Sequence, residues 1–447
     1  MTASLPDLTA RLLDAARKAG AEAADALAIH GTSTTIDVRR GALEQAERAE
    51  GTEIGLRVLF GGKQACVSSS GISDRTIAAL AERAVAMARE APNDPYAGLA
   101  DPDAIARDWD LAAFDLADPA AEPDAATLES DCRAVESAAL AAKGITQVEA
   151  SAGYSARAMH LAASNGFSGG YARTSRSLSA VAFTGEGTGM ERDWAGESRT
   201  YQSDLPDAAG IGALAAERAL SRAGAVKPVT GTYPVLFDER IASSLIGHLL
   251  SAVNGAAIAR GASWLRDALG TQVLPTGLSV IEDPHRPRIG ASRPFDGEGL
   301  PTRRRAIVQD GILTGWTLDL ATGRKLGMPS TANAARGTSS PPSPSTSNID
   351  LTQGTRTRDD LIRDMGTGLL VTSMIGSTIN PTTGDYSRGA AGFWVQNGVI
   401  SHPVNECTIA GNLRDMLLRL IPANDARAHL STRVPSCLID GLTLAGA

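Results

Sequence analysis

The stretch that decides the fold reads Asp-Tyr-Ser-Arg-Gly-Ala-Ala-Gly-Phe-Trp-Val-Gln-Asn-Gly-Val-Ile and occupies residues 385–400. Its Asn397-Gly398 pair lies between apolar residues, which is a strong signal for a two-residue hairpin turn. The small residues at 389–392 let the backbone approach a neighbouring segment closely. We therefore predict a tightly packed hairpin that begins with the side chains of Asp385, Tyr386, Ser387 and Arg388.

These four residues have two interpretations. In the first, Asp385 and Arg388 form a buried ion pair that serves only the fold. In the second, the four side chains line the inner surface of the C-terminal part of the chain, where the hairpin holds them rigidly. The sequence pattern alone does not separate the two interpretations.

Outward from this hairpin, the pattern of apolar residues predicts an α+β protein with two domains, residues 1–224 and 225–447. The N-terminal domain is predicted to hold helices and antiparallel strands in two successive units, joined by a long irregular connection at 91–125. Its predicted helices are 5–20, 73–90, 126–142 and 207–223, and its predicted strands are 24–29, 35–39, 53–60, 64–69, 146–154, 156–164, 175–184 and 188–194.

The C-terminal domain is predicted to be rich in strands and turns. Its predicted strands are 233–237, 279–282, 304–309, 312–318 and 368–374, interrupted by two helices at 238–253 and 412–420. Residues 338–348 are polar and proline-rich, which predicts a mobile surface loop or a short arm that contacts a partner. The run Arg303-Arg304-Arg305 is typical of a solvated strand end.

The composition limits the function classes. The formal net charge of -8 argues against a broadly basic nucleic-acid surface. The four cysteines are far apart and form no CxxC pair, which indicates reduced thiols in a cytosolic protein; they are Cys66, Cys132, Cys407 and Cys437. The N-terminus lacks an apolar signal core, and no run approaches the roughly 18 apolar residues of a spanning helix. We expect a cytoplasmic protein with no membrane or nucleic-acid partner.

Matches to common catalytic motifs are incomplete in this chain. Residues 166–170 match Gly-x-Ser-x-Gly, but a strand-like stretch follows them where a nucleophile elbow needs a helix, so we interpret them as a turn. A helical zinc site needs two histidines on one face, with an acidic residue beside the first. Helix 238–253 carries only His248, which Gly247 and Leu249 flank. Cys437 could supply a thiolate, but no second histidine or adjacent carboxylate accompanies the pair.

Several motifs resemble one family. The hairpin stretch resembles the C-terminal signature of the TldD/PmbA family, and of its PmbA (TldE) branch in particular. Further similar segments are 38–41, 244–255, 294–299, 303–304, 310–316, 324–327, 365–369 and 409–413. In this family the TldD-type subunit carries a zinc-binding His-Glu-x-x-x-His helix and a ligand cysteine near its C-terminus. The PmbA/TldE-type subunit lacks the zinc motif, as this chain does.

The resemblance implies a non-catalytic subunit of a zinc metallopeptidase complex that cleaves unfolded peptides and leader peptides in a shared chamber. It implies a TldD-type partner subunit that holds the zinc and no cofactor in this chain, and it leaves open whether the chain forms a homodimer when the partner is missing. It also implies that Asp385, Tyr386, Ser387 and Arg388 lie at a substrate channel or subunit contact. Two alternatives are a self-sufficient homodimeric metallopeptidase that uses His248 and Cys437, and a regulatory protein-binding factor of the gyrase-modulator type.

Overall fold

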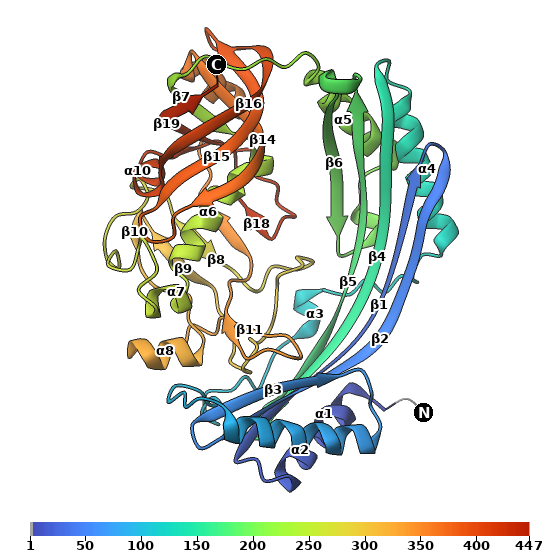
Figure 1. Cartoon of the computed structure of the whole chain (residues 1–447), viewed down its shortest axis with the longest axis vertical. Coiled ribbons are helices and arrows are strands. Elements are labelled where there is room, and N and C mark those ends of the chain that lie inside the picture. Colours follow the sequence, from blue (N-terminus) through green and yellow to red (C-terminus); the bar gives the residue numbers. More distant parts are fainter. Residues whose placement is uncertain (1–2, 447) are drawn as a thin grey trace.

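A long antiparallel sheet forms the N-terminal half of the protein (Figure 1). The computed structural model describes residues 3–446. The strand order is β3-β2-β1-β4-β5-β6, and every neighbouring pair is antiparallel. The strands are β1 (Ala23–Arg39), β2 (Ala42–Phe60), β3 (Lys63–Ser69), β4 (Ile145–Ala163), β5 (Ser168–Thr184) and β6 (Glu191–Arg199).

Strands β1 and β4 are continuous, so the prediction of two shorter strands in each place is wrong. β1 has 17 residues and β4 has 19. The sequence suggested a break at 30–34 because those residues are small or polar. They remain in the strand because each pairs with β2 on one side and with β4 on the other. A turn at Arg40-Gly41, with φ of 53° and 69°, joins β1 to β2.

Four helices cover one face of this sheet. They are α1 (Leu5–Lys18), α2 (Asp74–Glu90), α4 (Ala125–Leu140) and α5 (Ala208–Ser221), each capped by a Ser or Asp side chain. Side chains at alternate positions of β1 contact all four helices. Ala26 and Ala28 pack against α1 and α2, and Ile36 and Val38 pack against α4 and α5. The opposite face, which includes Leu27, turns toward the C-terminal half (Figure 1). Between α2 and α4 lies the short α3 (Leu111–Phe114).

The C-terminal half is β-rich, as predicted, and its larger sheet contains the hairpin. The strand order is β16-β15-β14-β7-β19-β17, and β16 also pairs with β19, which closes five of the strands into a ring. These strands are β7 (Gly231–Phe237), β14 (Gly368–Ile379), β15 (Asp385–Gln396), β16 (Val399–Asn412), β17 (Ile421–Pro422) and β19 (Cys437–Ala445). Asn397 and Gly398 have φ of 52° and 74° and join β15 to β16, which confirms the predicted hairpin.

A second sheet of short strands and five helices complete this half. The sheet has the order β10-β9-β8-β13-β18, and a separate two-stranded ribbon pairs β11 with β12. Its strands are β8 (Val280–Glu282), β9 (Arg305–Gln309), β10 (Ile312–Leu313), β13 (Ile349–Leu351) and β18 (Thr432–Arg433), and the ribbon is β11 (Ala334–Ala335) with β12 (Ser343–Pro344). The helices are α6 (Glu239–Ala252), α7 (Gly255–Ala259), α8 (Leu320–Leu326), α9 (Arg358–Met365) and α10 (Leu413–Leu418). The prediction of two helices missed α7, α8 and α9, which are too short to show a helical period.

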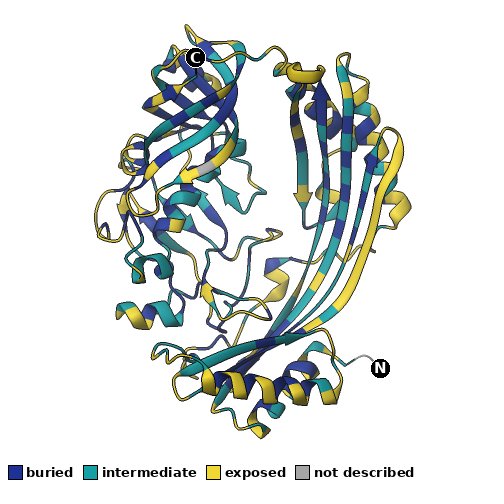
Figure 2. Ribbon diagram, in the orientation of Figure 1, coloured by how far each residue is buried: buried dark blue, intermediate teal, exposed yellow. Residues whose placement is uncertain are grey.

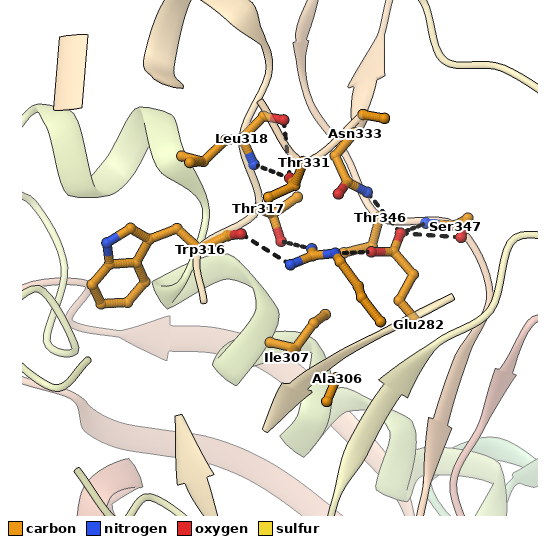
Figure 3. A network of polar contacts seen from close by, with 12 residues as sticks. Glu282, Ala306, Ile307, Trp316, Thr317, Leu318, Thr331, Asn333, Thr346 and Ser347 are labelled. Carbon is orange, nitrogen blue, oxygen red and sulfur yellow. Dashed lines mark hydrogen bonds and ion pairs between the residues drawn. The ribbon is translucent and has the colours of Figure 1, made fainter. Parts of the chain in front are cut away.

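Residues 338–348 are packed, so the prediction of a mobile surface loop is wrong. Thr338, Ser347 and Asn348 are buried, and β12 pairs with β11. The Ser347 backbone N–H donates to Glu282 Oε1 at 2.6 Å, and Glu282 also accepts from Asn333 Nδ2 at 2.7 Å (Figure 3). Composition misled the prediction because these polar groups find their hydrogen-bond partners inside the protein rather than in water.

The same buried carboxylate corrects the prediction for the arginine run. Arg305 Nε donates to Glu282 Oε2 at 2.8 Å, and the Arg305 side chain is 12% exposed. Arg304 remains 65% exposed, as expected for a solvated strand end. Arg303 and Arg304 are exposed and precede β9, whereas Arg305 begins the strand and turns its side chain into the interior.

The two halves contact each other through buried ionic and apolar groups. Arg336 of the C-terminal half pairs with Asp25 of β1, and Asp25 also pairs with Arg57 of β2. The first sheet draws its strands from residues 23–199 and the later sheets from 231–445. The division into domains at residues 224 and 225 stays a prediction. Across residues 3–446, no helix has the length and apolar character needed to cross a membrane.

Candidate functional site

Helix α6 borders a groove that Arg388 helps to line. The helix follows β7 directly, and the Asp238 side chain caps it by accepting from the Arg240 backbone N–H at 3.2 Å. Its apolar face, Ala242, Leu245, Ile246 and Leu249, is buried in the main core. The groove has a volume of about 340 Å³ and is lined by Arg240, Ile241, Ser243, Ser244, Gly247, Leu250, Met374, Arg388 and Thr432.

The four residues that begin β15 divide between its two faces. Tyr386 is 2% exposed, and its hydroxyl donates to Met374 Sδ at 3.3 Å. Arg388, on the same face, donates from Nε to the Gly376 carbonyl at 2.8 Å. Asp385 is exposed and accepts from Thr383 Oγ1 at 2.7 Å. The structure therefore brings Tyr386 and Arg388 to α6, but not Asp385 or Ser387.

The alternative of a buried Asp385–Arg388 ion pair is wrong. Asp385 accepts a second hydrogen bond from Asn412 Nδ2 at 3.1 Å, at the open end of the hairpin opposite its turn. These two hydrogen bonds lower the pKa of Asp385. The two residues are three positions apart on a strand, so their side chains point to opposite faces.

His248 of α6 lies against Tyr386 and Arg388. The rings of His248 and Tyr386 meet edge to face, with centroids 5.9 Å apart. Burial and the Arg388 charge lower the pKa of His248, and burial raises the pKa of Tyr386 to about 12. Both rings are therefore neutral near pH 7, and Arg388 is the charged group of this cluster.

His248 and Cys437 do not form a donor set that fits zinc. Cys437 is fully buried, and its thiol donates to the Pro435 carbonyl at 3.2 Å. Burial raises the pKa of this thiol, whereas zinc binds the thiolate. Within residues 3–446, no three His, Cys, Asp or Glu side chains gather in a way that could hold a metal ion.

An ionic network that the sequence did not reveal connects the groove to the first sheet. Arg240 Nη1 lies 3.2 Å from Asp193 Oδ1 of β6, and Arg240 Nε lies 3.1 Å from Asp238 Oδ1. The side chains of all three residues are nearly buried, at 8%, 5% and 4% exposure. Asp193 and Arg240 are 47 positions apart, so no local motif could have paired them. The groove therefore lies where the two halves of the protein meet.

The sheet face that no helix covers is lined by small polar residues. Alternate positions of β4 and β5 on this face carry serine or glycine, namely Ser151, Gly153, Ser155, Ser175, Ser177 and Ser179. Each of them is half-buried, and Ser151 and Ser179 lie between residues that pack on the helices. A groove of about 610 Å³ lies along part of this face, and Gly31, Ser33 and Ser155 are among the residues that line it. Because its side chains are small, this face leaves room for an extended peptide whatever side chains the peptide carries.

Comparison with known proteins connects this architecture to one group. Models of the PmbA/TldA metallopeptidase domain 1, central domain and C-terminal domain match residues 24–88, 118–223 and 230–446. Metalloprotease PmbA of Escherichia coli O157:H7 is 37% identical over 418 residues, which is 93% of this chain and 90% of that protein. A PmbA homologue of Haemophilus influenzae is 34% identical and covers 97% of this chain and 94% of its own.

Solved structures share the fold over the whole chain. A Bacteroides thetaiotaomicron protein described as a candidate modulator of DNA gyrase has a TM-score of 0.91 and 28% identity, with 98% of each chain covered. TldE of Thermococcus kodakarensis has a TM-score of 0.85 at 18% identity, covering 98% of this chain and 100% of its own, which shows the fold alone. Together these matches define a three-module α+β protein of metallopeptidase type.

The chain belongs to the PmbA/TldD family of metallopeptidases. This confirms the family resemblance seen in the sequence motifs. The placement of the family models also explains the repeated helix–strands–helix order of the N-terminal half. Domain 1 and the central domain each supply part of the one long sheet.

Proposed function

We propose that this chain is the non-catalytic subunit of a two-subunit zinc peptidase, in which a TldD-type partner holds the zinc. The complex would cleave unfolded peptides, such as leader peptides, in a chamber formed by both subunits in the cytoplasm. The observation that carries the proposal is the groove beside α6, which Arg388 lines. In the catalytic branch the corresponding helix carries zinc ligands, whereas here it presents Ser244, Gly247 and a neutral His248.

The uncovered face of the long sheet supports the same proposal. A chamber for unfolded peptides must tolerate many sequences, and small polar side chains allow close approach without a demand for a particular partner side chain. The serine and glycine positions of β4 and β5 provide such a surface. Extended peptides are commonly held through main-chain hydrogen bonds, which give affinity without reading side chains.

Co-expression with the TldD-type subunit of the same organism tests the proposal. We expect the two chains to co-purify and to cleave an unstructured peptide only together, with loss of activity on chelation. The chain alone should be inactive with or without added zinc, because one imidazole cannot fix the ion or its water. Chelator-sensitive cleavage by the purified single chain would contradict the proposal.

Metal analysis adds a second outcome. Stoichiometric zinc in the purified chain that disappears in His248→Ala and Cys437→Ala variants would instead identify a self-sufficient metallopeptidase. We expect no such dependence, because the Cys437 thiol is protonated and bonded to a backbone carbonyl. A His402→Ala variant serves as a matched control, since His402 lies on β16 and its ring contacts Ser401.

A further inference from the structure

A second cavity, of about 390 Å³, lies between the long sheet and the C-terminal half. Strands β1, β4 and β5 form one wall, and the segment at 290–297 with β11 forms the other. The volume is within the usual range for pockets that hold small ligands, roughly 300–1,000 Å³. Its walls combine four arginines, Arg157, Arg173, Arg293 and Arg336, with an apolar surface.

Most of the apolar surface lies on the sheet side of the cavity, and Phe295 adds to it from the opposite wall. It comprises Leu27, Ile29, Met159, Leu161, Tyr171 and Phe295. Tyr171 and Phe295 pack edge to face with centroids 5.5 Å apart, and the Arg173 guanidinium lies 5.1 Å from the Tyr171 ring centroid. An aliphatic or aromatic group in the cavity would therefore meet apolar side chains while it stays close to positive charge.

Three of the four arginines lack an acidic partner. In the part of the chain that the structure describes, no carboxylate forms an ion pair with Arg157, Arg173 or Arg293. Arg293 donates to the carbonyls of Ala334 and Ser345, at 3.3 and 2.7 Å. Arg173 donates to the carbonyls of Gly290 and Ser292. These neutral acceptors position the guanidinium groups but leave their charge uncompensated.

Two buried N–H groups of these arginines have no acceptor among residues 3–446. They belong to Arg293 Nε and Arg336 Nη2. The Arg336 side chain is 2% exposed, and its Nη1 is already paired with Asp25. A buried donor without an acceptor costs about 1–3 kcal/mol, and more when the group is charged. Both arginines border the cavity, so its walls contain guanidinium groups whose donors are not all satisfied.

Asp296 also lines the cavity, but its carboxylate is occupied. It accepts backbone N–H groups from Glu298 at 2.9 Å, and from Leu300 and Ala334 at 3.0 Å. Burial raises the pKa of Asp296, and the cavity holds four arginines against this one carboxyl group and that of Asp25, which pairs with Arg336. The cavity therefore presents a net positive charge to a ligand.

We infer that this cavity binds a carboxylate carried by an apolar or aromatic residue, such as the free C-terminal residue of a peptide. Arginine recognises carboxylates through paired hydrogen bonds, and the apolar wall would contact the attached side chain. The site lies entirely within this chain and is separate from the α6 groove. It therefore goes beyond the proposed function and does not depend on the partner subunit.

Calorimetric titration of the full chain tests this inference with three probes. The peptide Ala-Ala-Phe with a free C-terminus should bind, and its C-terminal amide should bind at least about tenfold more weakly, because charge-assisted hydrogen bonds are lost. N-acetyl-phenylalanine distinguishes the sources of the carboxylate. Binding equal to that of the peptide assigns recognition to any free apolar acid, and binding more than tenfold weaker assigns it to peptides.

Variants connect the binding to this cavity. Arg293→Gln should weaken binding of the free-acid peptide by about tenfold or more. Because Arg293 also holds backbone carbonyls, Arg157→Ala is a second variant, since Arg157 is exposed and should lose about threefold in affinity without loss of folding. Arg75→Ala, on the exposed side of α2, is the matched control and should leave affinity unchanged.

Several results would overturn the inference. They are equal binding of acid and amide, absence of binding by the free-acid peptide, and unchanged affinity in both Arg293→Gln and Arg157→Ala. Inorganic phosphate that binds as tightly as the free-acid peptide would also overturn it, since the site would then not use its apolar wall. If co-expression shows no complex with a TldD-type subunit, the proposed function fails, but the binding results for this cavity still stand. The two failures are therefore distinguishable.

Discussion

Arg305 and Arg388 lie in the same half of the protein, yet their surroundings differ. Arg305 is held by the Glu282 carboxylate, the Trp316 carbonyl at 3.0 Å and Thr317 Oγ1 at 3.1 Å (Figure 3). Arg388 donates to the Gly376 carbonyl and lines the α6 groove, and no carboxylate among the described residues forms an ion pair with it. An arginine whose donors are satisfied inside the protein stabilises the fold, whereas one with spare donors beside a groove is available to a ligand or partner.

The largest effect on stability is expected from deletion of residues 339–347. This segment includes Ser347, which bonds to Glu282, the ionic partner of Arg305. The deletion removes the Ser347 hydrogen bonds to Glu282 and the β11–β12 pairing. We expect the melting temperature to fall by more than about 5 °C. The control is deletion of only Ser339–Pro341, which are exposed, and it should have a much smaller effect. Equal melting temperatures of both deletions and wild type would show that the segment is dispensable for the fold.

Arg305→Ala should be the most destabilising single substitution in this comparison. It leaves Glu282, whose side chain is 2% exposed, without its charged partner. Removing one member of a buried pair costs about 3–5 kcal/mol in free energy of unfolding. Urea denaturation measures it, with Arg304→Ala as the adjacent exposed control, expected within about 0.5 kcal/mol of wild type. Similar losses in the two variants would remove the distinction between buried and solvated arginines.

Glu298→Gln should change how stability depends on pH. Burial and the neighbouring Asp296 raise the pKa of Glu298 to about 8, above the ordinary value of 4.5. The folded state therefore binds more protons than the unfolded state between these values, so stability falls as pH rises from about 4.5 to about 8. Glutamine stays neutral, and the variant should show a flatter melting-temperature profile over this range.

The control for this experiment is Glu186→Gln, because Glu186 is exposed near the end of β5. Its pH profile should follow that of wild type. If Glu298→Gln follows it as well, the Glu298 carboxyl does not titrate in the expected range. A melting temperature of Glu298→Gln below wild type at every pH would show that the carboxyl group, which accepts from the Leu320 N–H, stabilises the fold more than its titration destabilises it.

Arg388→Ala should have the smallest effect on stability and the clearest effect on binding. It removes one hydrogen bond to a carbonyl, a loss of about 1 kcal/mol. The pKa of His248 should rise, because the Arg388 charge now lowers it, and an NMR titration of the ring can follow this change. Assembly with the TldD-type subunit or peptide turnover by the complex should weaken.

Arg414→Ala is the matched control for Arg388→Ala, since Arg414 is an exposed arginine of α10. It should preserve assembly and turnover. A low melting temperature of Arg388→Ala with normal assembly and turnover would show that Arg388 serves the fold, as Arg305 does. The comparison between the two arginines would then fail.

Sequence patterns predicted the features that depend on local chemistry. The Asn397-Gly398 hairpin and the four amphipathic helices of the N-terminal half follow from turn residues, caps and periodicity. What they missed depends on partners distant in the chain. Ser347 bonds to Glu282 across 65 positions, and Arg336 pairs with Asp25 across 311, so neither burial could be predicted from composition. The possible Asp385–Arg388 ion pair failed for the opposite reason. These residues are close in sequence, but their side chains point to opposite faces of the strand.

The continuity of β1 has a consequence for synthesis of the chain. The backbone N–H of Ala24 in β1 donates to Ser164 Oγ across 140 positions. This side of β1 therefore has no partner until β4 has been synthesised. Strand pairing over such separations slows folding, and an unpaired edge can associate with other chains meanwhile. Ile36 and Val38 of β1 belong to the core beneath α4 and α5, so the central module cannot complete its packing without β1. A nascent chain that stops before the central module therefore exposes an open β edge.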